Sequence, residues 1–451
     1  MFKKRRILQN QDSHTSNTLD NQAACPDAIT GVQVGSEVGR LRRVFVHTPG
    51  SEVESMTPRS AQELLYNDII QFQQVQRGHA QLKGVLSLVA DTLEVKTCLS
   101  EVLLIPEARD WLLTEVTRFS NCPELLPELK LLPATECADL LIAGVPLKRD
   151  SLTSWLSERT YSIVPLPNMY FMRDTSLSVG NSHVIAAMAT GVRFAESLIM
   201  KAIYKWHPKF LCKDPLIDGM QFTSKEHSQF RIEGGDIQIV RENILMCGIS
   251  ERTSVQALDA LIENYWQARK LEGKEDPGFT LFAVTLPQER STIHLDMVFT
   301  FASPEQAVIY EPYILGRDRK KVVKVTVNKL GQKSFENVTN IIEGLKTVGV
   351  NIDPIFCGGQ DPLHQQREQW NSGANLFAFA PGKVISYAMH QHTVKAMEEA
   401  GFRAIHAKDV LKTPEVLNSN DNQVILLDGE ELARGGGGPR CMTCPVFRDR
   451  L

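Results

Sequence analysis

The C-terminal part of the sequence combines a run of glycines with a cysteine that could act as a nucleophile. Gly435–Gly438 are four successive glycines, and Cys441 follows them after a proline and an arginine. Glycine reaches backbone conformations that are closed to other residues and lets a ligand come close to the main chain. A thiol just beyond the run is therefore well placed to meet a substrate. The same residues could instead form a flexible loop that ends in structural cysteines.

Cys441 and Cys444 also form a C-x-x-C pair, which permits a metal-binding or redox interpretation. A structural zinc ion takes four ligands, and the sequence has no second C-x-x-C pair and no H-x3–5-H pair. His390 and His392 could only be forced into such a site. We therefore expect no metal at these cysteines, and a zinc protein stays as an alternative.

A histidine and a carboxylate lie two residues apart at His294-Leu295-Asp296, before the apolar run Met297–Phe299. If this tripeptide belongs to a strand, His294 and Asp296 point to the same face, because side chains alternate along a strand. Taken alone, the pair could equally be the exposed end of a strand.

Two further segments carry polar groups at the start of a predicted strand. Glu233-Gly234-Gly235-Asp236 precedes the strand 237–240, and its glycines would allow a bulge that aims the carboxylate inward. The segment Pro167–Asp174 contains an amide, aromatic rings, a cationic side chain and a carboxylate. Each could be an ordinary polar turn when it is considered by itself.

Together these residues fit the chemistry of a guanidinium group. This planar cation presents five N–H donors, so burying it requires several carboxylates, which Asp174, Glu233 and Asp296 could supply. Attack at its central carbon needs a thiolate, and the bound cation would itself help to ionise Cys441. Loss of ammonia and activation of water need one acid and base, for which His294 is the candidate.

The elements that must position these residues form a repeating pattern of two short strands and one helix, which is typical of an α/β fold. A Thr253-x-x-Gln256 capping box predicts the start of the second helix. Such repetition predicts a pseudo-symmetric assembly with ligand-binding loops where the units meet. The predicted units are strands 175–179 and 184–187 with helix 194–206, strands 237–240 and 244–247 with the capped helix, and strands 376–379 and 384–387 with a helix near 394–399.

The chain divides into a tail, a catalytic region and a helical insertion. Residues 1–30 are polar without an apolar face, which predicts a disordered tail. We expect the fold to occupy 31–451, with a first strand at 44–46. Between about 60 and 165 the apolar residues recur at helical spacing with prolines as breakers, so we expect a helical insertion at about 80–160.

The composition narrows the possible partners and compartments. The formal net charge is -4, from 49 basic and 53 acidic residues, which gives no broad surface for nucleic acid or an anionic membrane. No apolar run reaches the roughly 20 residues that span a bilayer. Nine cysteines at irregular spacing fit a reduced intracellular protein. We expect a cytoplasmic protein that binds a small molecule.

With these residues in place, the sequence resembles the arginine deiminase family of the guanidino-group-modifying pentein superfamily. The matching segments follow the family's order over roughly residues 35–450. They are Ser36–Leu41, His47–Gly50, Pro167–Asp174, Glu233–Asp236, Glu251–Thr253, His294–Asp296, Arg367–Asn371 and Cys441–Pro445.

The resemblance implies a five-bladed αβ propeller with a small helical domain inserted after the first unit. It also implies hydrolysis of L-arginine to L-citrulline and ammonia through a thiouronium (amidino-cysteine) intermediate, which is the first step of arginine catabolism by the deiminase pathway. Neither a metal nor another cofactor is implied. A homo-oligomer, dimer or tetramer, is expected.

The resemblance also assigns roles to individual residues. Cys441 would be the nucleophile, His294 the acid and base, and Glu233 the residue that orients His294. The remaining expected site residues are Asp174 and Asp296 for the guanidinium, Asn168, Arg193 and Arg252 for the substrate carboxylate, Phe171 for its aliphatic stem, and Gly435 and Gly436 for close approach of the backbone.

One departure from the family pattern concerns the residue before the nucleophile. Arg440 stands where some members have histidine, and since arginine also occurs there in relatives, we treat it as tolerated. The tail lies outside the resemblance.

Other reactions would use the same groups: dimethylarginine hydrolysis, amidinotransfer, or a two-step dihydrolysis to ornithine. The pair Arg193 and Arg252 favours free arginine, because it offers cations to an α-carboxylate. A non-catalytic arginine-binding protein is a further alternative, although binding alone needs no nucleophile.

Overall fold

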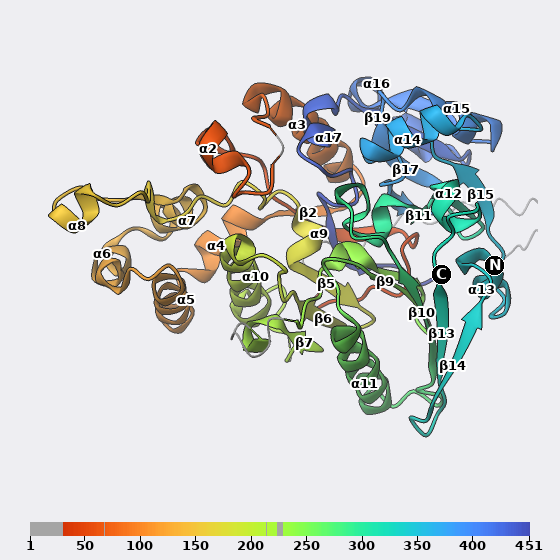
Figure 1. The fold of residues 1–451 in the computed structure, drawn as a ribbon, viewed down its shortest axis with the longest axis horizontal. Coiled ribbons are helices and arrows are strands. Elements are labelled where there is room, and N and C mark those ends of the chain that lie inside the picture. The colour runs from red at the N-terminus through yellow and green to blue at the C-terminus, as the bar shows by residue number, and fades with distance from the viewer. Residues whose placement is uncertain (1–29, 67, 213, 223–228) are drawn as a thin grey trace, which may run out of the picture. The chain divides into compact units, whose positions relative to one another are not determined.

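The computed structural model describes residues 30–66, 68–212, 214–222 and 229–451 (Figure 1). Residues 31–451 form one compact unit. Its strands and helices make a mixed α/β fold, which the alternating pattern of the sequence predicted. The predicted tail, residues 1–30, lies outside the described residues except for Thr30.

A strand-strand-helix-strand unit recurs four times between residues 176 and 427. In each copy the first two strands are antiparallel, and a later strand runs parallel to the second one after a helical connection. The copies are β5 (Ser176–Val179), β6 (Ser182–Ile185), α10 (Phe194–Trp206) and β7 (Ile217–Asp218); β8 (Ile237–Arg241), β9 (Ile244–Ile249), α11 (Val255–Leu271) and β10 (Phe279–Thr285); β11 (Phe299–Phe301), β12 (Gln306–Ile309), α13 (Ile341–Lys346) and β15 (Asp353–Phe356); and β16 (Phe377–Ala380), β17 (Lys383–Tyr387), α15 (Gln391–Glu399) and β19 (Gln423–Leu427).

The strand pairs predicted in three of these copies are confirmed, with ends that differ by at most two residues. The helix predicted over 194–206 is confirmed at both ends. The capping box at Thr253 is wrong, because Ser254 is the N-cap of α11 and its side chain accepts a hydrogen bond from the Ala257 N–H. The hydroxyl of Thr253 instead accepts from the Glu233 N–H at 3.2 Å, which keeps Thr253 in the preceding loop.

The first sheet joins segments from opposite ends of the described chain. β1 (Leu41–Val46) lies between β2 (Asp91–Glu94), which is parallel to it, and β20 (Cys444–Arg448), which is antiparallel. The helix α3 (Phe72–Ser87) connects β1 to β2. This sheet and α3 therefore repeat the arrangement of strands and helix found in the four copies. The strand that is antiparallel to β1 comes from the C-terminal side of the chain.

Helices dominate the segment that follows β2. They are α4 (Val95–Val102), α5 (Pro106–Phe119), α6 (Leu126–Leu131), α7 (Ala134–Ala143) and α8 (Leu152–Trp155). Pro106 begins α5, as expected for a residue that lacks an N–H at a position where none is needed. Leu112 and Leu113 of α5 share a buried apolar cluster with Leu198 of α10, which attaches the helices to the sheets.

Shorter elements complete the unit. They are α1 (Ser51–Glu54), α2 (Pro58–Ala61), α9 (Met172–Thr175), α12 (Glu311–Ile314), α14 (Pro362–Trp370), α16 (Ala407–Lys412), α17 (Glu430–Arg434), β3 (Val145–Pro146), β4 (Tyr161–Ile163), β13 (Val322–Val327), β14 (Lys333–Val338) and β18 (Arg403–His406). Within the described ranges, no helix combines the length and apolar character needed to cross a membrane.

Removing the N-cap of α11 is expected to destabilise the protein. Ser254→Ala leaves the first-turn N–H group of Ala257 without its side-chain acceptor, at a cost of about 1 kcal/mol in the free energy of unfolding. Urea denaturation measures this change. Ser254→Thr keeps a hydroxyl acceptor and is the matched control, so equal losses in both variants would contradict the capping role.

Candidate active site

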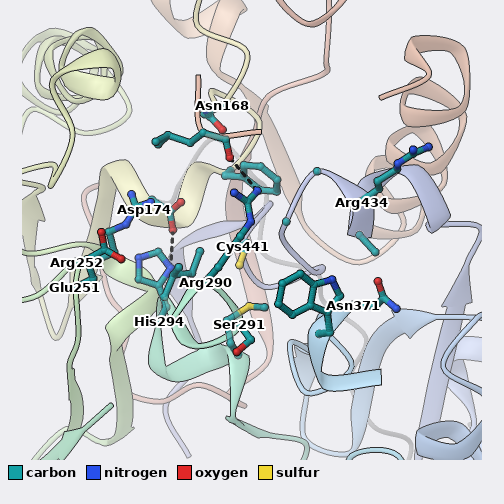
Figure 2. A pocket seen from close by; sticks show the side chains of 18 of the residues that line it. Asn168, Asp174, Glu251, Arg252, Arg290, Ser291, His294, Asn371, Arg434 and Cys441 are labelled. Atoms are coloured by element: carbon teal, nitrogen blue, oxygen red, sulfur yellow. Dashed lines mark hydrogen bonds and ion pairs between the residues drawn. The ribbon is translucent and has the colours of Figure 1, made fainter. Parts of the chain in front are cut away.

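A cavity of about 580 Å³ collects most of the predicted site residues (Figure 2). This volume lies in the range that small-ligand sites occupy. Glu233 and Asp296 are fully buried, so they support the wall without lining it. The predicted residues that line the cavity are Asn168, Phe171, Asp174, Arg193, Arg252, His294, Gly435, Gly436 and Cys441.

Asn375 holds the loop that carries Cys441. Its side-chain oxygen accepts hydrogen bonds from the backbone N–H groups of Arg440 at 3.1 Å and Cys441 at 3.2 Å. Its amide nitrogen donates to the sulfur at 3.1 Å. The glycine run allows this close packing, because a Cβ at Gly438 would lie 2.5 Å from the backbone oxygen of Asn375. Gly436, with φ of +101°, turns the chain where it lines the cavity.

The thiol of Cys441 is protonated at neutral pH in this environment. Burial raises its pKa well above the ordinary value, and the charges of Asp296 and Asp174 raise it further. The sulfur lies 3.8 Å from Asp296 Oδ2. Arg440 lowers the pKa by less than the other effects raise it. A cation placed between the sulfur and the carboxylates would therefore ionise the thiol.

His294 does not lie on a strand, which corrects the sequence prediction. Residues Leu295–Met297 form a 3-10 turn, and β11 begins only at Phe299. The turn forms because the carboxylate of Asp236 accepts a hydrogen bond from the Leu295 N–H at 2.9 Å, so this N–H is unavailable to a sheet. His294 and Asp296 therefore do not share a strand face, although both still lie beside the cavity.

Glu233 fixes the imidazole of His294. The two side chains are joined by a hydrogen bond of 3.0 Å from Nε2 to Oε2. Residues Gly234–Asp236 form a 3-10 turn where a bulge was predicted. Gly235 is in contact with the imidazole, because a Cβ there would lie 2.5 Å from His294 Nδ1. The glycines thus make room for the histidine.

The surrounding carboxylates keep His294 protonated. Burial lowers its pKa, but the charge of Asp174 and the hydrogen bond to Glu233 outweigh burial and raise the pKa to about 9. Nδ1 lies 3.6 Å from Asp174 Oδ1 and has no hydrogen-bond partner among the described residues. The imidazolium therefore has one N–H that is fixed and one that is available.

Asp174 and Asp296 are each held by an arginine of the chain. Asp174 Oδ2 is 2.6 Å from Arg193 Nη1, and Asp296 Oδ2 is 2.8 Å from Arg440 Nη1. The other oxygen of each carboxylate, Oδ1, is buried without a hydrogen-bond partner among the described residues. A buried polar atom of this kind is costly, and at a functional site it indicates that a ligand donor completes the bonding.

Arg193 is engaged by groups of the protein in this structure. Its guanidinium binds Asp174 and both oxygens of Glu196, and it also donates to the backbone oxygens of Asn168 and Phe171. It therefore positions Asp174. The Asn168 side chain is engaged as well, because Nδ2 donates to the Leu64 backbone oxygen at 2.8 Å.

Arg440 lies behind the cavity. It is about 1% exposed, and it joins Asp296 to Glu37, whose oxygens are 3.1 Å from its Nε and Nη2. Burial raises the pKa of Glu37, but Arg440 and other arginines lower it to about 2. Arg440, the residue that departs from the family pattern, is therefore a buried side chain that holds Asp296 in place.

Sequence reasoning missed four residues around the site. Arg290 lines the cavity, four positions before His294. Its charge was a weak signal, and so was the position of Glu196 three residues after its partner Arg193. The other two, Glu37 and Asn375, gave no signal as site residues because their partners are distant in sequence.

Asp174, Glu233 and His294 could geometrically hold a metal ion, since one ligand atom of each lies within 4.8 Å of the others. Arg193 and Arg252 already supply positive charge to this cluster, with Arg252 Nη1 3.5 Å from Glu233 Oε1. Both Cys441 and Cys444 are free thiols. Cys444 donates to the Ser176 backbone oxygen at 3.3 Å, away from the partners of Cys441.

Comparison with known proteins gives matches over most of the chain. A family model described as arginine deiminase matches residues 62–448. Arginine deiminase of Lactococcus lactis subsp. cremoris is 31% identical over 440 residues, covering 93% of this chain and 99% of that protein. That of Oenococcus oeni is 29% identical over 437 residues, covering 93% and 98%. An amidinotransferase of Microseira wollei superposes with a TM-score of 0.48 at 14% identity, covering 95% and 98%.

Neutralising Glu233 is expected to lower the pKa of His294. In Glu233→Gln the imidazolium loses a buried negative partner, so its pKa should fall from about 9 by about 1–3 units. NMR titration of the isotope-labelled imidazole measures the shift. Asp68→Asn, at the exposed rim of the cavity, is the control for general charge effects. A similar shift in both variants would contradict the role assigned to the contact between Glu233 and His294.

Proposed function

The chain belongs to the arginine deiminase family, and from this premise we propose that it hydrolyses L-arginine to L-citrulline and ammonia. The observation that carries the proposal is the convergence, at one cavity, of a thiol, a protonated imidazole and two buried carboxylates, each with an oxygen that has no hydrogen-bond partner among the described residues. Carboxylates in this number suit a guanidinium, and a thiol beside them suits attack on its carbon.

Substrate binding is proposed to use Asp174 and Asp296. Their Oδ1 atoms, which have no hydrogen-bond partner among the described residues, would accept N–H groups of the guanidinium, which satisfies two buried acceptors at once. Phe171 would pack on the aliphatic stem, because it lines the cavity between Asn168 and the glycine run. The ion pairs with Arg193 and Arg440 hold the two carboxylates in position before the substrate binds.

The bound substrate would activate Cys441. The two carboxylates that raise the thiol pKa in the free protein become paired with the guanidinium cation, so their effect on the sulfur is cancelled. The thiol then releases its proton to solvent. The donor amide of Asn375, 3.1 Å from the sulfur, stabilises the resulting thiolate.

In the first half-reaction the thiolate attacks the guanidinium carbon and forms a C–S bond. His294 donates the proton from Nδ1 to one terminal nitrogen, the C–N bond breaks, and ammonia departs. The product on the protein is a cationic amidino-cysteine, and His294 is left neutral. Glu233 holds Nε2 throughout, so the ring keeps its orientation.

In the second half-reaction neutral His294 removes a proton from water. The hydroxide adds to the same carbon, the C–S bond breaks, and the electrons return to the sulfur as thiolate. The nascent citrulline loses its extra proton to solvent, where ammonia takes up one proton and the thiolate regains the proton that it released earlier. Water, arginine and the two products balance without any further reactant.

Related guanidine chemistry would use the same thiol and imidazole. Dihydrolysis to ornithine, dimethylarginine hydrolysis and amidinotransfer are therefore separated from the proposed reaction by their products. Arginine residues at the cavity favour a free amino acid, since they offer cations to an α-carboxylate. Retention of a complete nucleophile, acid and base distinguishes an enzyme from an arginine-binding protein.

A five-bladed αβ propeller is the arrangement we propose for the sheets. The proposal is supported by four sequential copies of one unit and a first sheet with the same arrangement of strands, which would be the five blades. The helical segment at about 80–160 would then be an insertion after the first blade, with the catalytic region spanning 31–451. Because β2 belongs to the first sheet, the inserted helices begin with α4.

A homo-oligomer and a cytoplasmic location stay predictions. An edge strand can pair with another chain. β14 is such a strand, and Phe335 on it is 65% exposed, which supports assembly through this edge. Light scattering of the purified protein measures the oligomeric state.

Product analysis tests the proposed reaction. Purified protein incubated with L-arginine is expected to release citrulline and ammonia in equal amounts, and Cys441→Ala to release neither, because no C–S bond can form. Cys444→Ser is the matched control and should keep turnover. Ornithine with doubled ammonia would mean dihydrolysis, and the absence of any product from the unmodified protein would overturn the proposal.

Neutralising Asp296 is expected to affect the thiol and the turnover in opposite directions. In Asp296→Asn a negative charge beside the sulfur is lost, so the pKa of Cys441 falls and iodoacetamide labels it faster in the free protein. Arginine turnover should nevertheless fall by roughly 10- to 100-fold, because a charged partner of the guanidinium is lost.

Peptide mapping of labelled Cys441 and steady-state kinetics measure these two effects. Slower labelling, or unchanged kinetics, in Asp296→Asn would contradict the roles given to this carboxylate.

A further inference from the structure

The motif Arg367–Asn371 is one of the segments that match the family, but the proposed reaction gives it no role. Its residues form the end of α14 and the first residue after that helix. Trp370 and Asn371 line the cavity (Figure 2). Glu368 and Gln369 are buried beside it. Buried polar side chains need hydrogen-bond partners, and the partners of these two indicate what the motif does.

Glu368 fastens the end of α14 to the start of α15. Its carboxylate accepts hydrogen bonds from the N–H groups of His392 at 2.9 Å and Thr393 at 2.8 Å, and from the Thr393 hydroxyl at 2.6 Å. A carboxylate is favourable at the N-terminus of a helix, because the first N–H groups have no partner within the helix. His390 Nε2 also donates to the Asn371 backbone oxygen at 2.9 Å. The last turn of α14 is therefore held firmly against α15.

Gln369 joins the two ends of the loop that carries His294. Its amide nitrogen donates to the Ser291 backbone oxygen and to the Met297 backbone oxygen, the latter at 3.2 Å. An amide nitrogen carries two hydrogens, so it can make both bonds at once. Ser291 lies three residues before His294, and Met297 lies three residues after it. One side chain thus holds the backbone on both sides of the histidine.

The position of the His294 imidazole depends on this loop. Glu233 holds Nε2 and Gly235 contacts the ring, but both of these contacts act on the ring itself. The backbone that carries the ring needs a constraint of its own. A proton donor must lie within hydrogen-bond reach of the nitrogen that it protonates, and a displacement of about 1 Å can lower a rate roughly 100-fold.

We propose that Gln369 is a positioning residue for His294, because its two hydrogen bonds fix the loop that presents the imidazole to the substrate. The inference rests on the proposed function, in which His294 is the acid and base. Gln369 is well suited to this task, since the preceding residue, Glu368, anchors the same helical turn to α15. The motif therefore contains one residue that anchors, one that positions, and two, Trp370 and Asn371, that line the cavity.

Two matched variants separate positioning from a general loss of stability. Gln365 lies one turn earlier on α14 and donates to the Gly359 backbone oxygen at 2.8 Å, outside the His294 loop. Gln365 and Gln369 are both 4% exposed. Methionine has a similar size and no N–H donor, so Gln365→Met and Gln369→Met each remove one buried amide. Only Gln369→Met should lower kcat for L-arginine by roughly 10- to 100-fold, measured where both variants are folded.

NMR titration of the His294 imidazole gives a second readout that needs no turnover. In Gln369→Met the ring is held less closely beside Asp174 and Glu233. Its pKa should therefore fall from about 9 toward the ordinary value of a histidine. In Gln365→Met the pKa should stay at about 9. A merely structural role of Gln369 would leave the pKa unchanged in the folded variant.

An equal fall in kcat in the two methionine variants, or an unchanged pKa of His294 in Gln369→Met, would overturn the assignment. If Gln369→Met does not fold, Gln369→Glu and Gln365→Glu give the same comparison with a milder change, because a buried protonated carboxyl keeps one donor. If the unmodified protein forms no citrulline, the proposed reaction fails, whereas the pKa comparison still decides whether Gln369 positions His294.

Discussion

Burying carboxylates beside a thiol is the constraint on which the rest of the site depends. An unpaired buried charge costs several kcal/mol, so each acidic group here is stable only because a cation of the chain holds one of its oxygens. Arg440 does this for Asp296, and Arg193 does it for Asp174. Both arginines are themselves shared with a second carboxylate, Glu37 and Glu196 respectively. Two buried rows of ion pairs result, in which negative and positive side chains alternate, and each row ends at the cavity.

These series connect elements that are distant in sequence. Glu37 precedes β1, Arg440 precedes β20, and Asp296 precedes β11, so one series of ion pairs joins the loops before these three strands, including the loop that carries Cys441. Asn375 adds a neutral tie from the loop before β16. The sheets place the ends of these elements next to one another. Short loops at these ends can therefore hold the side chains of the site in fixed orientations, although the loops themselves are neither helix nor strand.

Much of this arrangement could be predicted from the sequence, and the remainder has a physical reason for being missed. Alternation and helical spacing identified the strand pairs near 176–185, 237–249 and 377–387, and the motifs identified Cys441, His294 and Glu233. Periodicity could not reveal that the Asp236 side chain captures a backbone N–H and converts the segment at His294 into a 3-10 turn. It also could not pair Glu37 with Arg440, because such partners are defined only by the tertiary fold. The resemblance assigns Arg193 to the substrate carboxylate, and it did not reveal that Glu196 and Asp174 hold the guanidinium of Arg193.

The pairing of β1 with β20 has a consequence for vectorial synthesis on the ribosome. β1 emerges early, but its antiparallel neighbour emerges only after the four repeated units, so one edge of β1 stays open during most of translation. Contacts between such distant segments form late, since the entropy of closing a long loop must be overcome first. An open strand edge in a nascent chain is a target for chaperones and for mispairing. The loop that carries Cys441 therefore reaches its final geometry in one of the last steps of folding, when β20 pairs with β1.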